Sequence, residues 1–209
     1  IGRVCYEEVV HLLLYSKLPN KNELDDFRAQ LFSEMKLPKE IIRSIKSFPL
    51  HSHPMEVLRT EVSHLSTYDP EHGDNSERAY EKRAIRLVAS VPTIVATLYR
   101  LRTNRKLVAP KQEFGFAENF LYMFRGFPAD SEEKEAINRF MMLHADHGFN
   151  ASTFSARVTA STNSGMYSAA TSAIGTLKGP LHGGASEKVM DMLDDINTCL
   201  LYTSDAADE

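Results

Sequence analysis

Apolar residues recur at helical spacing along most of the chain, and no stretch alternates apolar and polar residues as a half-buried strand does. The clearest stripe is Ile137, Phe140, Met141 and His144, at positions i, i+3, i+4 and i+7 of one expected helix. We expect about nine or ten such segments, joined by short links and without an internal repeat. The sequence therefore predicts an all-α globule.

Capping residues mark several helix starts. Asn20 with Glu23, and Asp130 with Glu133, have the capping-box spacing, in which each side chain bonds the other residue's backbone N–H. The polar segment 68–76 contains proline and glycine, which predicts a loop. These signals separate the expected helices from one another.

Prolines and small residues predict further boundaries. Ser52 is expected to cap a helix that carries Pro54 in its first turn. A helix is expected over 77–90, with Pro92 starting the next one, because proline disrupts a helix interior. Small residues fill 160–175, which predicts a helix that a neighbour can approach closely, either inside the protein or at a subunit contact.

Composition excludes several classes of function. The 209 residues are enough for one sizeable core, and a net charge of -4 without a basic block argues against nucleic acid as a partner. No apolar run approaches the roughly 20 residues that a membrane span needs. Cys5 and Cys199 form no disulfide or metal pattern, so we expect a cytoplasmic protein in a reducing compartment.

One segment presents a histidine among glycines. Residues 179–186 read Gly-Pro-Leu-His-Gly-Gly-Ala-Ser and follow a helical, alanine-containing run. Proline ends a helix, and glycine lets a backbone approach a ligand closely. The imidazole of His182 can donate a hydrogen bond to a carbonyl or carry a proton near neutral pH. Taken alone, the same residues also fit a surface histidine in a turn.

The segment 179–186 resembles the catalytic-histidine motif of the citrate synthase family. Residues 143–154, Leu-His-Ala-Asp-His-Gly-Phe-Asn-Ala-Ser-Thr-Phe, resemble the family's oxaloacetate-binding segment. Residues 53–60, which begin His-Pro-Met and end Leu-Arg-Thr, resemble an earlier signature, and residues 6–19 are similar to its N-terminal part. The likeness extends from about residue 6 to about residue 196, as in a bacterial-type member truncated at both ends.

The resemblance implies roles for four residues. His182 is the catalytic histidine, which donates a hydrogen bond to the enolate oxygen formed from an acyl-CoA. His147 is expected to hydrogen-bond oxaloacetate, and Asn150 and Ser152 are expected to line the same pocket. From the residues alone, Asn150 and Ser152 would also end one helix and begin the next. The resemblance implies no metal or cofactor, and acetyl-CoA takes part as a substrate.

The resemblance also predicts what is missing. The family's catalytic aspartate and its second catalytic histidine lie downstream of this sequence, so the chain alone is expected to be inactive. We assign 1–182 to a partial large domain and 183–196 to the start of a small domain. Residues 197–209 resemble nothing in the family and are interpreted as an artefactual tail that packs poorly. Ser186 replaces the family's common asparagine, and either residue can cap the helix expected over 187–196.

The implied activity is that of a citrate synthase of the tricarboxylic acid cycle. It condenses acetyl-CoA with oxaloacetate and water to give citrate and CoA, and the family implies a homodimer. The alternative within the family is a 2-methylcitrate synthase that uses propionyl-CoA. A non-catalytic helical binding or scaffold module, in which the histidines are structural, is the alternative from another class.

A zinc hydrolase is the third class. His144, Asp146 and His147 place three potential ligands within four residues. However, the two histidines are spaced i, i+3 rather than i, i+4 as in the His-Glu-x-x-His motif, and no third ligand motif follows. For Arg59 an ion pair within the protein is at least as plausible as a substrate contact, and for Arg157 an ion pair is the default expectation.

Overall fold

The computed structural model describes residues 4–146 and 148–205, with 186 and 197–205 described for the backbone alone. Within these ranges the chain forms ten α-helices, one short 3-10 helix (Ser66–Tyr68) and no strand, which confirms the all-α prediction. The helices are α1 (Tyr6–Tyr15), α2 (Lys21–Glu34), α3 (Lys39–Ser47), α4 (Pro54–Leu65), α5 (Glu77–Arg102), α6 (Phe116–Arg125), α7 (Ser131–His144), α8 (Ala151–Ser161), α9 (Met166–Leu177) and α10 (Gly184–Asp205).

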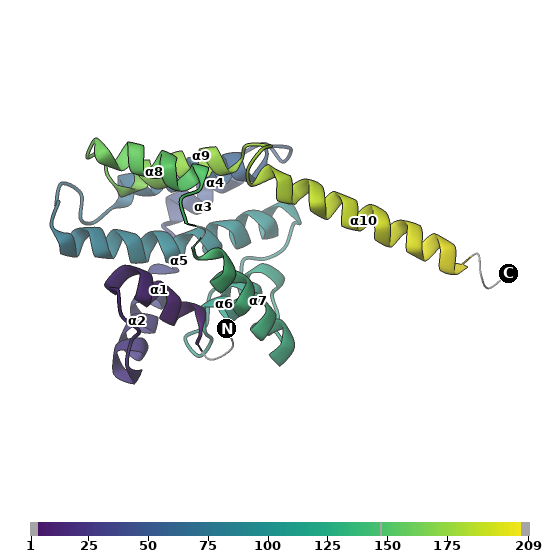
Figure 1. Cartoon of the computed structure of the whole chain (residues 1–209), viewed down its shortest axis with the longest axis horizontal. Helices are drawn as coiled ribbons and strands as arrows, with labels where there is room; N and C mark the ends of the chain where they lie inside the picture. Colours follow the sequence, from purple (N-terminus) through teal and green to yellow (C-terminus); the bar gives the residue numbers. More distant parts are fainter. Residues whose placement is uncertain (1–3, 147, 206–209) are drawn as a thin grey trace.

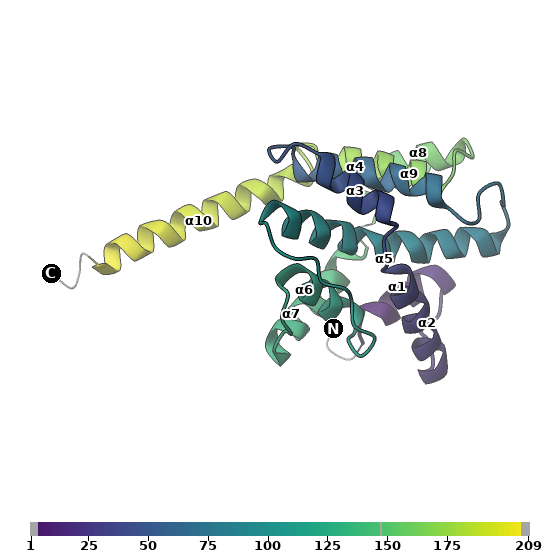
Figure 2. The same cartoon turned by 180° about the vertical axis from the view of Figure 1, so that it is seen from behind.

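The long helix α5 separates two layers of helices (Figure 1). Helices α3, α4, α8 and α9 lie on one side of it, and α1, α2, α6 and α7 lie on the other, as the reverse view also shows (Figure 2). Helix α10 projects away from both layers. The site residues predicted on α8 and after α9 therefore belong to one layer.

Each layer has its own apolar core, and α5 contributes to both. On the α4 side, Val57 and Ile94 are completely buried. On the α2 side, Phe27, Leu31 and Ala89 are at most 2% exposed. Full burial of one such large apolar side chain contributes about 1.5–3 kcal/mol, so α5 is held from two sides.

Helix α5 is apolar enough to resemble a membrane-spanning helix. It contains an 18-residue window with a mean hydropathy of 1.4, half of which is buried inside the protein. It is the one helix in the described part of the chain with this length and hydropathy. Because both of its faces pack on protein, its position in the core accounts for its apolarity.

The predicted helix break at Pro92 is wrong, because α5 continues through this residue. Proline removes one backbone hydrogen bond and costs a helix interior about 3 kcal/mol. Ala89 and Ile94, on either side of Pro92, are both 0% exposed and belong to opposite cores. Burial along the whole helix thus outweighs the local cost of the proline.

The two predicted capping boxes are confirmed. Asn20 accepts from the backbone of Glu23 at 3.0 Å, and Glu23 accepts from the backbone of Asn20 at 2.9 Å. Asp130 and Glu133 make the equivalent pair of bonds at 2.9 and 3.0 Å. These caps satisfy backbone N–H groups at the starts of α2 and α7.

Two other predicted boundaries differ from the structure. The N-cap of α4 is His53 rather than Ser52, since Nδ1 of His53 accepts from the backbone of Met55 at 3.2 Å. The small-residue run 160–175 is not one helix but the end of α8 and most of α9. A turn with Gly165 at φ 90° reverses the chain between them and lays α9 along α8.

The apolar stripe expected on α7 is only partly buried, with Met141 packed against the core on the α2 side. No residue of α7 is fully buried, and Phe140 is 56% exposed. The last helix also differs from prediction, because α10 runs without interruption to Asp205 instead of ending near Ile196. Both helices present apolar side chains to solvent, as the exposure of Met190 and Leu193 on α10 illustrates.

Arg86 of α5 ties the layers together. Its guanidinium donates to Glu34 of α2 at 2.9 Å, to Asp69 at 2.7 Å and to Glu71 at 2.9 Å. It also lies 3.4 Å from the hydroxyl of Tyr167 on α9. Burial lowers the pKa of Arg86, but its hydrogen bonds outweigh this effect and hold the pKa above its ordinary value. The arginine is therefore charged and joins α2, α5, α9 and the 69–71 loop.

We expect Arg86→Met to lower the free energy of unfolding by about 3 kcal/mol, because removing one member of a buried ion network leaves the other charges without compensation. Denaturant unfolding followed by circular dichroism measures this change. The control is Lys82→Met, which removes a pair between a 49% exposed lysine and Glu71 and should cost under about 1 kcal/mol. Equal losses in the two variants would contradict the role assigned to Arg86.

Candidate functional site

His182 lies in a tight turn between α9 and α10. Its backbone N–H donates to the carbonyl of Gly179 at 2.9 Å, and its own carbonyl accepts from Ala185 at 3.1 Å. The N–H of Gly184 also donates to Gly179, at 3.1 Å. Leu181 is 99% exposed, whereas His182 is half-buried. The turn thus directs the histidine inward and its neighbour outward.

Close packing explains the paired glycines that follow His182. A Cβ atom on Gly183 would lie 2.4 Å from the carbonyl oxygen of Leu177 and 2.7 Å from its side chain. On Gly184 a Cβ would lie 3.0 Å from the carbonyl of Gly179. The turn folds back so closely on the end of α9 that a side chain at Gly183 would displace backbone atoms.

Ser152 is the side-chain partner of His182. Ser152 Oγ and His182 Nε2 are 2.7 Å apart, although 30 residues separate them in sequence. Ser152 lies in the first turn of α8, and its Oγ is also 3.1 Å from the carbonyl oxygen of Ala173 on α9. The antiparallel packing of α8 on α9 therefore brings two predicted site residues into contact.

The hydroxyl of Ser152 has a single proton, so two arrangements are possible. If it donates to Ala173, His182 must carry a proton on Nε2 and donate it to Ser152. If it donates to Nε2, a neutral His182 carries its proton on Nδ1. Within the part of the chain that the structure describes, Nδ1 of His182 makes no hydrogen bond. Nδ1 is therefore the ring nitrogen left for a ligand.

Asn150 is the N-cap of α8, as its capping potential predicts. Its Oδ1 accepts from the backbone of Thr153 at 3.0 Å. The first backbone N–H groups of α8 are next to Ser152, and such groups favour an anion. His147, predicted as an oxaloacetate ligand, lies outside the described residues.

The other polar residues of the 143–154 segment have local partners. Nδ1 of His144 donates to the carbonyl of Phe140 at 2.7 Å, although the residue is exposed. Asp146 accepts from the backbone of Gly148 at 3.0 Å. Among the side chains that the structure describes, no group of three or more His, Cys, Asp or Glu residues is arranged to hold a metal ion.

The two arginines that were candidates for ion pairs have other surroundings. Arg157 lies over the ring of Phe149, 5.2 Å from its centre. The stem of Arg59 covers Gly175, where an added Cβ would be in ordinary contact at 3.5 Å. Neither arginine has an acidic partner within 4 Å among the described residues, although the charge of Arg59 contributes to the lowered pKa of Glu56.

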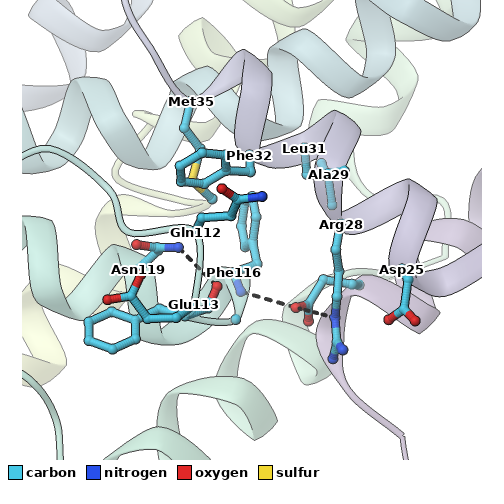
Figure 3. A pocket seen from close by; sticks show the side chains of 13 residues that line it. Asp25, Arg28, Ala29, Leu31, Phe32, Met35, Gln112, Glu113, Phe116 and Asn119 are labelled. Carbon is cyan, nitrogen blue, oxygen red and sulfur yellow. Dashed lines mark hydrogen bonds and ion pairs between the residues drawn. The ribbon is translucent and has the colours of Figure 1, made fainter.

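A separate pocket of about 350 Å³ lies in the other layer, between α2 and the residues around the start of α6 (Figure 3). Its buried carboxylate, Glu7, already accepts from Arg28 at 3.3 Å and from the backbone of Phe116 at 3.0 Å. Burial, together with the charge of Glu7, raises the pKa of the nearby Cys5 thiol to about 12. A protonated thiol is a poor nucleophile, so this pocket offers no reactive group comparable to His182.

The contact between Ser152 and His182 was not predicted from the sequence. Both residues were candidates, but nothing in their spacing shows that they touch. The only signal was the small-residue content of 160–175, which predicts close helix packing. In the structure that packing is between α8 and α9, where Ser155 and Ser172 also share a hydrogen bond.

The chain matches known proteins along nearly all of its length. A family model described as citrate synthase, C-terminal domain, matches residues 1–206. Citrate synthase 2 of Bacillus subtilis is 48% identical over 192 residues, which cover 91% of this chain and 52% of that protein. A 2-methylcitrate synthase of Mycobacterium tuberculosis is 42% identical over 194 residues, covering 92% and 49%. The chain spans about half the length of the curated relatives it matches.

Solved structures agree with these relatives. A citrate synthase from Thermoplasma acidophilum, in a ternary complex with carboxymethyl coenzyme A and oxaloacetate, superposes with a TM-score of 0.87 at 31% identity. The match covers 92% of this chain and 50% of that one. A citrate synthase from Pyrobaculum aerophilum gives a TM-score of 0.84 at 38% identity, covering 89% and 48%.

The glycine after the histidine provides a direct test of the turn. We expect Gly183→Ala to force the turn away from Leu177, so that the amides of His182 and Ala185 exchange with solvent faster. The control is Gly175→Ala inside α9, since that Cβ would make only ordinary contact with the Arg59 side chain of α4 and alanine favours a helix by up to about 1 kcal/mol. Hydrogen exchange followed by NMR measures both, and unchanged exchange in Gly183→Ala would contradict the packing described for the turn.

Proposed function

The chain belongs to the citrate synthase family, and from this membership we propose that it contributes to the condensation of acetyl-CoA with oxaloacetate and water, giving citrate and CoA. The observation that best supports this proposal is the 2.7 Å contact between Ser152 and His182. It gives a histidine one fixed ring nitrogen and one available ring nitrogen. The alternative activity within the family uses propionyl-CoA, and relatives of this chain are named for both reactions.

The reaction needs a donor where negative charge develops. A base removes a proton from the methyl carbon of the acetyl thioester, and the electron pair moves onto the thioester oxygen as an enolate. The enolate carbon then forms a bond to the keto carbon of oxaloacetate, while the C=O π electron pair moves onto the keto oxygen, which takes a proton from an acid. Water then adds to the thioester carbonyl, and the C–S bond breaks to release CoA as its thiol. We assign the donor at the enolate oxygen to His182, because a preorganised donor stabilises that charge best in a site closed to water.

We propose that Ser152 selects the nitrogen of His182 that donates, by directing its single proton to Nε2 instead of to the carbonyl of Ala173. When the Ser152 hydroxyl donates to Nε2, a neutral imidazole has its proton on Nδ1, the nitrogen without a described partner. That proton is then available for the enolate oxygen. The serine thus holds both the orientation and the tautomer of the ring, and this role is additional to the substrate contact that its position in the motif implies.

The keto-acid pocket is proposed at the start of α8. His147, Asn150 and Ser152 are assigned to it, together with the first backbone N–H groups of the helix, which suit an anionic dicarboxylate. Asn150 combines this assignment with its bond to Thr153, since one side-chain oxygen can cap the helix while the amide nitrogen remains a donor.

The remaining catalytic groups are proposed to lie outside the sequence. We assign 1–182 to part of a large helical domain and the residues from 183 onward to the start of a smaller one. This division places the boundary within the turn that carries His182. The base and a second histidine would come from the half of the family pattern that this chain does not span. The 209 residues alone are therefore expected to lack activity.

We also propose a cytoplasmic homodimer. Large apolar side chains of α7, α8 and the link between them are more than half exposed, among them Phe140, Leu143, Phe149 and Phe154. The rings of Phe149 and Phe154 are 5.9 Å apart and meet edge to face. Gathered apolar surface of this kind is typical of a protein–protein contact. The cytoplasmic location is supported by the cysteine content alone.

The activity is tested by CoA release from the coding sequence read through to its own stop codon. We expect release to require oxaloacetate, and His182→Ala to lower kcat by about 100- to 1,000-fold, the usual effect of removing one oxyanion donor. Acetyl-CoA and propionyl-CoA are compared side by side, and the faster thioester identifies the natural acyl group. If neither reacts in well-folded protein, the synthase proposal fails and a non-catalytic scaffold takes its place.

The dimer is tested with one charge in the exposed apolar surface. Phe154→Glu is expected to convert a dimer into a monomer, because it places a carboxylate in an apolar contact. Leu50→Glu is the control, since Leu50 is 77% exposed and lies before α4, outside α7 and α8. Sedimentation velocity measures both masses, and a monomeric parent chain would contradict the proposal.

A further inference from the structure

The residues at the start of α4 have no role in the mechanism above, yet they contact both ends of the turn that carries His182. We propose that His53 and Glu56 form a brace that positions His182. Glu56 holds Lys178, four residues before the histidine, and His53 holds Glu187, five residues after it. The meaning of this brace for catalysis rests on the proposed function, but its effect on the turn does not.

The first contact joins α4 to the end of α9. Nζ of Lys178 donates to the carboxylate of Glu56. The hydrogen bond from Lys178, together with its charge, lowers the pKa of Glu56. Lys178 is the C-cap of α9, directly before the turn begins. The pair therefore fixes where the chain leaves α9.

The second contact joins α4 to the start of α10. Nδ1 of His53 accepts from the backbone of Met55, so a neutral His53 has its proton on Nε2. Nε2 lies 3.6 Å from a carboxylate oxygen of Glu187 in the first turn of α10. One imidazole thus caps α4 and faces α10 at the same time.

The brace is itself attached to the core. Arg102, the last residue of α5, donates to the carbonyl of Ser52, directly before His53. A continuous set of contacts therefore leads from the central helix through the start of α4 to both sides of the turn. Exposed polar contacts contribute little to stability, and even an ion pair typically contributes under about 1 kcal/mol, so these two act on geometry rather than on folding.

Geometry matters at this position because the contact with Ser152 is short and directional. The turn has three internal backbone bonds, and α10 projects from the body beyond it. Without the brace, the chain on either side of His182 can shift relative to α8. A displacement of about 1 Å in a catalytic group can lower a rate by about 100-fold.

The brace is tested in the 209-residue chain by the ring signals of His182 in carbon-edited NMR spectra. These signals are assigned by their loss in the His182→Gln variant. We expect Lys178→Met to shift or broaden these signals, and Lys178→Arg to restore them. Lys188→Met, which removes the same charge from α10, is the matched control and should leave them in place. His53→Asn is expected to act like Lys178→Met, because asparagine keeps the cap but cannot reach Glu187.

Glu187→Gln provides a variant that folding problems cannot obscure, since it is isosteric and Glu187 is 65% exposed. If the His182 signals are unchanged in the double variant that carries both Lys178→Met and Glu187→Gln, the brace proposal is overturned. A shift in Lys188→Met as large as that in Lys178→Met would overturn it as well. If the signals respond as expected while the CoA assay fails, the brace stands and the proposed reaction does not.

Discussion

The structure depends on one helix that is covered on both faces. Helix α5 supplies Ile94 to the core on the α4 side and Ala89 to the core on the α2 side, and both residues are completely buried. Arg86 adds charge-assisted bonds to α2, to the 69–71 loop and, through Tyr167, to α9. Because both faces of α5 are buried, the helix tolerates an internal proline and is as apolar as a membrane-spanning helix. The helices that carry the site residues are positioned relative to α5.

The site uses this support indirectly. None of its residues comes from α5, but α9 packs against α4 and α5, and α8 packs along α9. The small side chains of α8 and α9 let the two helices approach until Ser152 reaches both Ala173 and His182. Gly183 then allows the turn to fold onto Leu177, so that the histidine points toward α8. The position of the His182 imidazole is thus set by the packing of α8 on α9, by the absence of a side chain at Gly183 and by the hydroxyl of Ser152.

Much of the fold could be read from the sequence, because helix periodicity and capping are local. The caps at Asn20 and Asp130 are correct since each needs only residues three positions apart. The helix break predicted at Pro92 is wrong because the burial of both faces of α5, which outweighs the cost of the proline, comes from distant helices. In the site, the motifs identify His182 and Ser152, but their contact depends on how α8 turns back along α9 at Gly165. The tertiary partners of His53 and Lys178 had no local signal either.

The protonation of His182 tests the central claim most directly. Long-range proton–nitrogen correlation spectra of the labelled 209-residue chain distinguish a ring protonated on Nδ1 from one protonated on Nε2. We predict that the neutral ring carries its proton on Nδ1, with the single Ser152 proton directed to Nε2 instead of to the carbonyl of Ala173. A neutral ring protonated on Nε2 would contradict this assignment, since Ser152 would then be the acceptor and no proton would remain for an enolate oxygen.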